Sequence, residues 1–111
     1  MCVINLEKRI KGPVVAWKIF NFSKGRLSGI RGFLYEVGET YKSGAPGFQA
    51  FVNKEDAEHA ITGTWLTGSV VRKVLLYDAA KGVIDNMDSF CDGKPAWTAN
   101  RIFIPRKSKN D

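Results

Sequence analysis

The chain has 111 residues, of which 44% are hydrophobic and 25% are charged. This length suits one domain with its own core and is too short for two, and the composition excludes a wholly disordered chain. Lys and Arg number 17 against 11 Asp and Glu, so the formal net charge is +6. Such an excess favours polyanionic partners, namely nucleic acid, nucleotides or an acidic protein surface, although it also serves solubility alone.

Cysteine and histidine are too few for a structural zinc site. Cys2 and Cys91 are the only cysteines, without CxxC spacing, and His59 is the only histidine,. No apolar run approaches the ~20 residues of a membrane span, and no signal-peptide pattern is present. We therefore expect a cytosolic protein with reduced thiols and no cofactor, although a disulfide between the two cysteines stays open.

The first half of the chain predicts short strands separated by turns. Residues 1–13 form a short strand or an N-terminal arm, which ends at Gly12-Pro13. Residues 14–22 form the first long strand, with both faces largely apolar and only Lys18 interrupting them. Shorter extended pieces are expected at residues 26–30, 33–37 and 47–52, and Tyr41 packs against the core between two turns.

One helix is predicted after the strand at residues 47–52. Asn53 is the expected N-cap, and Asp56 stands at the third helical position, near the positive end of the helix dipole. Gly63 ends the helix after roughly ten residues. The expected buried stripe consists of Ala57, Ala60 and Ile61.

The second half again predicts strands. Residues 70–77 are β-branched and aromatic without a breaker, so they give the strongest strand signal. Residues 78–82 return the chain, with one helical turn as an option, and residues 83–87 form another short strand. Residues 97–104 form one closing strand, followed by a basic tail at residues 105–111 that we expect to fray. Alternation along the closing strand puts Trp97, Ala99, Arg101 and Phe103 on one face.

Strands outnumber helices and lack the regular alternation of βαβ units, so the predicted fold class is α+β. We expect a mainly antiparallel, twisted sheet of five or six strands with one short helix packed on one face, in a single domain spanning residues 1–111. Trp17, Trp65 and Trp97 present more apolar surface than one short helix covers, which predicts a homo-oligomer.

The sequence contains no recognisable catalytic pattern. A nucleophile such as Cys91 would need a base, and His59 lies on the predicted helix among carboxylates. Asp85 and Asp88 are typical turn residues, and the glycine-containing turns do not match a P-loop or a dinucleotide fingerprint. We therefore predict a non-enzymatic protein.

Basic residues beside aromatic residues indicate anion binding instead. Arginine binds phosphate with parallel hydrogen bonds, and an exposed ring gives a base a surface for stacking. Arg101 is the first candidate, because its predicted strand face also carries Trp97 and Phe103. Arg31, at a glycine turn, and Arg106, at the strand end, are secondary candidates. The alternative for Arg101 is a salt bridge with a carboxylate such as Glu36, or a snorkelling side chain.

The block Arg31-Gly-Phe-Leu-Tyr-Glu-Val-Gly-Glu-Thr-Tyr41, followed by Gly47-Phe-Gln-Ala-Phe51, resembles a small uncharacterised domain family of bacteriophage and prophage proteins. The likeness covers residues 16–104. Relatives often have histidine where this chain has Gln49, so any chemical role of that histidine is lost here. The layout is similar, more loosely, to phage Thoeris anti-defence proteins, which bind cyclic nucleotide signals and hold them away from the host effector.

The resemblance implies a phage-encoded, non-enzymatic anti-defence protein in the host cytoplasm that sequesters a phosphate-bearing cyclic nucleotide. The expected ligand-binding residues are Arg101, Arg31, Arg106, Trp97 and Phe103. The charge supports an alternative, a protein that binds nucleic acid or a host protein that handles nucleic acid. A remote alternative is an ADP-ribosyltransferase, which the Gly-Phe-x-x-Phe strand and the helix resemble. Such enzymes need a late glutamate, and none follows Glu58.

Overall fold

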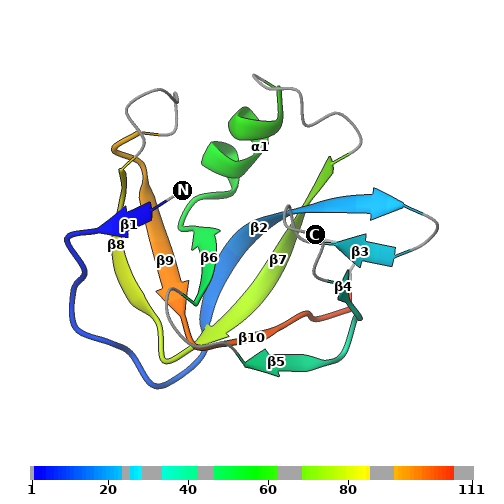
Figure 1. Ribbon diagram of the computed structural model, residues 1–111, viewed down its shortest axis with the longest axis horizontal. Coiled ribbons are helices and arrows are strands. Elements are labelled where there is room, and N and C mark those ends of the chain that lie inside the picture. Colours follow the sequence, from blue (N-terminus) through cyan, green and yellow to red (C-terminus); the bar gives the residue numbers. More distant parts are fainter. Residues whose placement is uncertain are drawn as a thin grey trace.

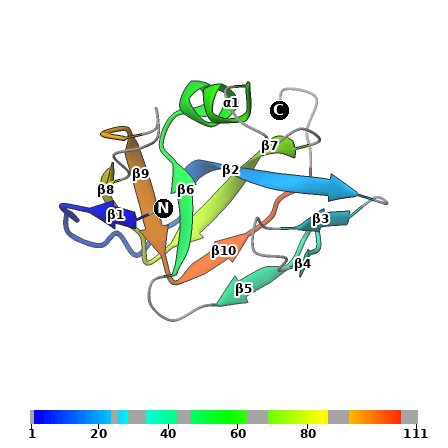
Figure 2. The ribbon, with the colours of Figure 1, turned by 45° about the horizontal axis from the view of Figure 1, so that its top comes forward.

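The structure, a computed structural model, describes residues 2–23, 26–28, 34–42, 47–62, 69–85 and 92–106. Within these ranges ten strands form one antiparallel sheet, and one short helix packs against it (Figure 1, Figure 2). The predicted α+β class is confirmed. The strand count exceeds the predicted five or six, because several strands have only two or three residues and carry no periodic pattern of their own.

The bounds of the elements place most strands where the sequence predicts them. In chain order they are β1 (Cys2–Ile4), β2 (Val14–Ser23), β3 (Arg26–Ser28), β4 (Leu34–Tyr35), β5 (Thr40–Lys42), β6 (Phe48–Phe51), α1 (Lys54–Thr62), β7 (Ser69–Tyr77), β8 (Ala80–Asp85), β9 (Pro95–Ala99) and β10 (Arg101–Phe103).

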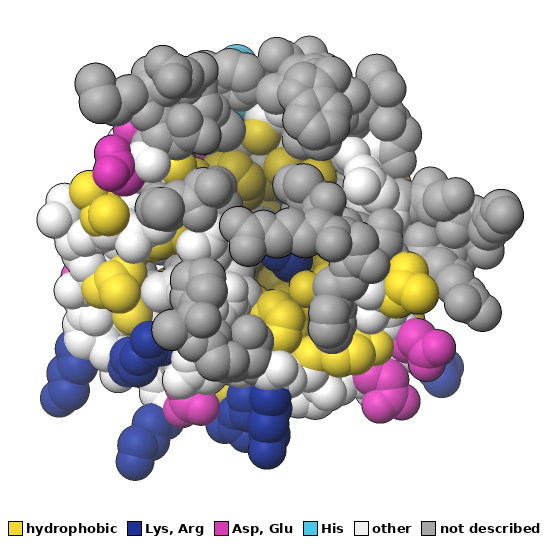
Figure 3. Space-filling view, in the orientation of Figure 1, with side chains coloured by type: hydrophobic (Ala, Val, Ile, Leu, Met, Phe, Trp, Pro, Cys, Tyr) yellow, Lys and Arg dark blue, Asp and Glu magenta, His cyan; other side chains and the backbone are white. Residues whose placement is uncertain are grey.

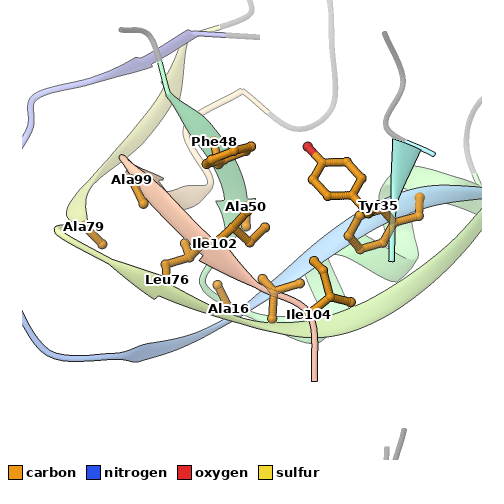
Figure 4. Close-up of a cluster of buried hydrophobic side chains, with 11 residues drawn as sticks. Ala16, Tyr35, Phe48, Ala50, Leu76, Ala79, Ala99, Ile102 and Ile104 are labelled. Atoms are coloured by element: carbon orange, nitrogen blue, oxygen red, sulfur yellow. The ribbon is translucent and has the colours of Figure 1, made fainter. Parts of the chain in front are cut away.

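Five of the strands form a ring around the main core. β6 pairs with β2, β2 with β7 and β7 with β10, while β9 pairs with the other side of β6. β9 continues into β10 through a bend at Asn100, so the chain itself closes the ring,. One side of each strand therefore faces the interior, and Figure 4 shows buried hydrophobic side chains that line it. The buried residues of this main core are Ala16, Phe20, Tyr35, Phe48, Ala50, Val74, Leu76, Ala79, Ala99, Ile102 and Ile104.

The helix α1 packs on the outer side of the ring. Ile19 on β2 and Phe51 on β6 are buried there, and Trp17 is partly buried beside them. The predicted helical stripe is confirmed, since Ala57 and Ala60 are buried in this second core. None of the described residues forms a helix that is long and apolar enough to cross a membrane.

Asn53 immediately precedes α1, as predicted for its N-cap. Its Nδ2 donates a hydrogen bond to Oδ2 of Asp56 at 3.3 Å, and its backbone carbonyl accepts one from the amide of Ala57 at 3.4 Å. Two contacts of one residue thus hold the first turn. The predicted C-terminal residue, Gly63, lies outside the described residues.

The predicted closing strand at residues 97–104 is two strands, and its predicted faces are wrong. The bend at Asn100 separates β9 from β10 and shifts the alternation by one residue. Ala99 and Ile104 consequently face the same main core, although one position is odd and the other even. Arg101 faces the outside. Alternation counted through an unbroken strand cannot detect such a bend.

The chain turns after β7 without the optional helical turn. Asp78 has a φ of 54°, in the left-handed region that Asp tolerates better than most residues. β8 begins at Ala80, earlier than the strand predicted to start at residue 83. Residues 86–91, which include Met87, lie outside the described residues.

The N-terminal segment is partly a strand. β1 pairs with β8 at the edge of the sheet, and an isolated bridge joins Ile10 to Ala79. Of the two expectations for residues 1–13, the short strand is the one observed. In the C-terminal tail, Pro105 is half-buried and Arg106 is exposed, and residues 107–111 lie outside the described residues.

Candidate anion-binding face

Arg101 lies on the outer side of β10, between two strands. The antiparallel register places it opposite Lys42 on β5 and opposite Tyr77 on β7. Its guanidinium carbon lies 5.0 Å from the centroid of the Tyr77 ring, which is a cation–π distance,. Its Nε donates to Oδ2 of Asp78 at 3.3 Å. The salt-bridge alternative for Arg101 is therefore present, with Asp78 as the partner rather than Glu36.

This salt bridge leaves Arg101 accessible. The side chains of Arg101 and Asp78 are 40% and 36% exposed, and ion pairs this exposed stabilise a protein by about 0–1 kcal/mol. Only Nε contacts Asp78, so among the described residues the two terminal nitrogens have no hydrogen-bond partner. Arg9 reaches the same turn and donates to the backbone carbonyl of Asp78. Figure 3 shows Lys and Arg side chains along the lower edge of the molecule, where Figure 1 places the turn between β7 and β8.

Phe103 lies on the same outer side, two residues further along β10. It stands opposite Thr40 on β5 and Leu75 on β7, and Leu75 stands opposite Val15 on β2. Val15 is 51% exposed, while Phe103 and Leu75 are half-buried. Apolar and aromatic surface therefore continues across this part of the sheet.

A further basic and aromatic pair lies toward α1. Lys73 on β7 stands opposite Trp17 on β2, and Nζ of Lys54 on α1 lies 5.1 Å from the Trp17 ring centroid. Together, the outward positions of β2, β5, β7 and β10 hold three cations, three aromatic residues and no carboxylate. We call this surface the outer basic face; its residues are Val15, Trp17, Lys42, Lys73, Leu75, Tyr77, Arg101 and Phe103.

Trp97 does not belong to the outer basic face. It packs against the main core, and its indole Nε1 is buried without a hydrogen-bond partner in the described part of the chain. The prediction that Trp97 shares a face with Arg101 is therefore wrong, because the bend at Asn100 turns the two side chains to opposite sides.

Of the two secondary candidates, the structure describes only Arg106. Arg106 is exposed just beyond β10, and Arg31 lies outside the described residues. Of the predicted set, the structure brings together Arg101 and Phe103. Sequence reasoning missed Lys42 and Tyr77, because strand register, which makes them neighbours of Arg101, is set by tertiary pairing.

Two further features bear on chemistry. Gln49 lies half-buried on β6 between the inward-facing Phe48 and Ala50, so its side chain points to the outer side,. Among the described residues, no three His, Cys, Asp or Glu side chains are grouped to hold a metal ion.

Comparison with known proteins gives no match: no family model fits the chain, and no similar curated protein or solved structure was found.

Proposed function

We propose that the protein binds single-stranded nucleic acid, without catalysis, on the outer basic face. The observation that carries this proposal is the composition of the outward positions of four adjacent strands. Lys42, Lys73 and Arg101 supply positive charge there, and three aromatic residues supply ring surface. No carboxylate occupies an outward position of these four strands; Asp78, which pairs with Arg101, lies in the turn after β7. Single strands bind to sheet surfaces of this kind through phosphate contacts to cations and through bases stacked on aromatic rings.

The shape of the face supports an extended ligand. The outer basic face is the outside of a closed ring of strands, so it curves away from a ligand instead of surrounding it. Tight sites for small molecules bury about 70–90% of the ligand surface. A nucleic acid strand needs no such enclosure, because it adds contacts along its length.

The test is fluorescence anisotropy with a labelled mixed-sequence DNA strand of about 20 nucleotides. If three cations contact phosphates, log Kobs should fall with log[NaCl] with a slope of about −2. Arg101→Gln and Lys42→Gln should each weaken binding about tenfold, or ~1.4 kcal/mol.

Lys94→Gln is the matched control, because it removes the same charge next to α1, where Lys94 Nζ lies 3.9 Å from Asp56. An equal loss in Lys94→Gln and Arg101→Gln would show that only net charge matters. Absence of binding at about 50 mM NaCl, where phosphate contacts are strong, would contradict the proposal.

The phage resemblance supports a second candidate, sequestration of a phosphate-bearing cyclic nucleotide in the host cytoplasm. Arg101 and Phe103 on one face favour it, since one can bind a phosphate and the other can stack on a base,. The protein would be incubated with cyclic nucleotides and then denatured by heat. Sequestration predicts release of unchanged ligand, and a cleaved product would contradict it. Competition by DNA would show that both ligands use the outer basic face.

A further inference from the structure

Two basic side chains face the interior of the ring, directly opposite each other. The register of β2 and β7 pairs Lys18 with Arg72. Ala16 and Phe20, two residues on either side of Lys18, are fully buried in the main core, so alternation directs Lys18 inward as well,. Like charges opposite each other on one face of a sheet repel and destabilise it.

Among the described residues, each of these cations has one hydrogen bond, to a backbone carbonyl. Nζ of Lys18 donates to the carbonyl of Gln49 at 3.0 Å, and Nη2 of Arg72 donates to the carbonyl of Pro105 at 3.1 Å. An ammonium has three N–H donors and a guanidinium has five, so most of their donors have no partner in the described part of the chain. No carboxylate of the described residues forms an ion pair with either. Burial without such a partner lowers the pKa of Lys18 to about 8,.

A third N–H donor lies on the line of cross-strand neighbours that contains Lys18 and Arg72, which we call the row. Trp97 on β9 stands opposite Ala50 on β6. The pairing of Trp17 with Phe51 places Ala50 opposite Lys18 in turn,. Nε1 of Trp97 is buried and has no acceptor among the described residues, although buried donors in proteins are normally paired. The row therefore carries three kinds of N–H donor and no anionic acceptor.

The surroundings of the row are small or aromatic. Figure 4 shows Ala16 and Ala50 directed into the interior, where they contribute only methyl groups. The Phe20 ring, next to Lys18 on the inner side of β2, packs edge-to-face on Tyr35 with centroids 5.2 Å apart. Figure 3 shows basic side-chain atoms bordered by hydrophobic ones in the middle of one face.

We propose that Lys18, Arg72 and the indole N–H of Trp97 form an anion-binding site inside the ring for the phosphate group of a small phosphate monoester. A phosphate dianion neutralises both cations and supplies acceptors for all three donors. The adjacent aromatic rings favour a planar group on the ester, so a nucleoside monophosphate is the ligand class. The site lies on the opposite side of β2 and β7 from the outer basic face and does not depend on the proposed function.

The first test uses the unmodified protein. Acetic anhydride acetylates neutral amines, and burial lowers the pKa of Lys18 to about 8, so at this pH a larger fraction of Lys18 than of an ordinary lysine is neutral,. Acetylation of each lysine is measured by mass spectrometry in millimolar inorganic phosphate, in AMP and in NaCl of equal ionic strength. We expect phosphate or AMP to slow acetylation of Lys18 about fivefold and to leave Lys94 unchanged.

Protection by phosphate alone supports the anion site, and protection by AMP at lower concentration supports both the site and the aromatic contact. If neither protects Lys18, the proposal is overturned.

The second test uses variants that each remove one donor. Phosphate at ten times its Kd should raise the Tm of the wild-type protein by roughly 6 °C compared with NaCl. Lys18→Met should abolish this rise, and Trp97→Phe, which removes only the N–H, should weaken phosphate binding about tenfold. Arg101→Gln, on the outer basic face, should respond like wild type. A normal response in both interior variants would overturn the proposal, and the acetylation test decides the matter if either variant fails to fold.

Discussion

At the scale of single residues, Lys18 is unusual because its amine is directed into the interior of the ring and has a lowered pKa. Its titration can be measured through the pH dependence of stability. Burial lowers its pKa from 10.5 to about 8, so between these pH values the unfolded chain binds more protons than the folded one. Stability therefore rises with pH through this window. Below this window, the charge on the buried Lys18 amine costs on the order of 3 kcal/mol of folding free energy,.

We expect Lys18→Met to have a higher Tm than wild type at pH 7, because methionine carries no charge. This advantage should shrink as the pH rises from about 8 toward 10.5,. Thermal unfolding of both proteins across this range measures the difference, and two parallel curves of Tm against pH would show that Lys18 does not titrate in the window.

Above pH 10 a second group contributes to the pH dependence of stability, since burial and then Tyr41 raise the pKa of Tyr35 to about 12. The unfolded tyrosine ionises first there, so this contribution to stability is lost as the pH rises further.

Asp78 gives a second prediction at this scale. It combines a φ of 54° with the salt bridge to Arg101, and Asn tolerates this φ as well as Asp does. Asp78→Asn should therefore keep the turn, release Arg101 and raise DNA affinity by a few fold, with a change in stability below about 1 kcal/mol. Asp85→Asn changes the net charge equally at an exposed position of β8. An equal gain in both variants, measured by anisotropy, would count against a role for the released Arg101.

The extent to which the site could be predicted differs from residue to residue. Arg101 and Phe103 could be paired from the sequence, because residues two apart in an unbroken strand share a face. Trp97 was misplaced because the bend at Asn100 has no signature in the sequence. Lys18 was visible only as an interruption of an apolar strand; its opposition to Arg72 depends on strand register, which sequence alone does not give,.

At the scale of elements, long segments were predicted well and short ones were not. β2 and β7 have enough β-branched and aromatic residues to indicate strands by themselves,. The two residues of β4 and the three of β5 are strands only because neighbours pair with them. Their place in the sheet is a tertiary effect, and so is the number of strands.

The contact between β1 and β8 gives a prediction for a whole element. A Cβ at Gly82 would clash with the carbonyl oxygen of Ile4 and would lie 2.9 Å from Cγ1 of Val3. β9 holds β8 on its other side, whereas β1 is a three-residue strand at the edge. Gly82→Ala should therefore displace β1, costing about 1–3 kcal/mol.

Hydrogen exchange measures this effect. The amides of residues 2–4 and 83–85 should exchange faster in Gly82→Ala, while those of β2 and β7 should stay protected. Gly12→Ala is the control, because no atom of the described residues lies within 4 Å of the Cβ position there. Unchanged exchange of β1 in Gly82→Ala would mean that the edge strand tolerates the added methyl group.

At the scale of the whole molecule, the same strands present an interior lined by buried side chains on one side and a charged, partly apolar surface on the other. Val15, at 51% exposure, lies on β2, at one side of that outer surface. Two occupants can cover it, a nucleic acid strand or a second copy of the chain, and they exclude each other. Salt should weaken the binding of nucleic acid and strengthen self-association, so the salt dependence distinguishes the two occupants.

The sequence predicts a homo-oligomer, and we expect it to form through the outer basic face in a salt-dependent way. Two facing copies bring Lys42, Lys73 and Arg101 near their counterparts, and this repulsion weakens as the Debye length falls from about 10 Å at 0.1 M salt to about 3 Å at 1 M. Apolar contacts such as that of Val15 are not weakened by salt in this way. The light-scattering mass should therefore rise from the 12.4 kDa monomer at low salt toward twice that value at high salt, whereas DNA binding should weaken over the same range.

Two variants test whether Val15 lies in the interface. Val15→Glu should prevent the rise in mass, and Leu34→Glu, at a 56% exposed position on β4, should not prevent it. A monomeric mass at every salt concentration would rule out self-association through this face and leave it to the nucleic acid.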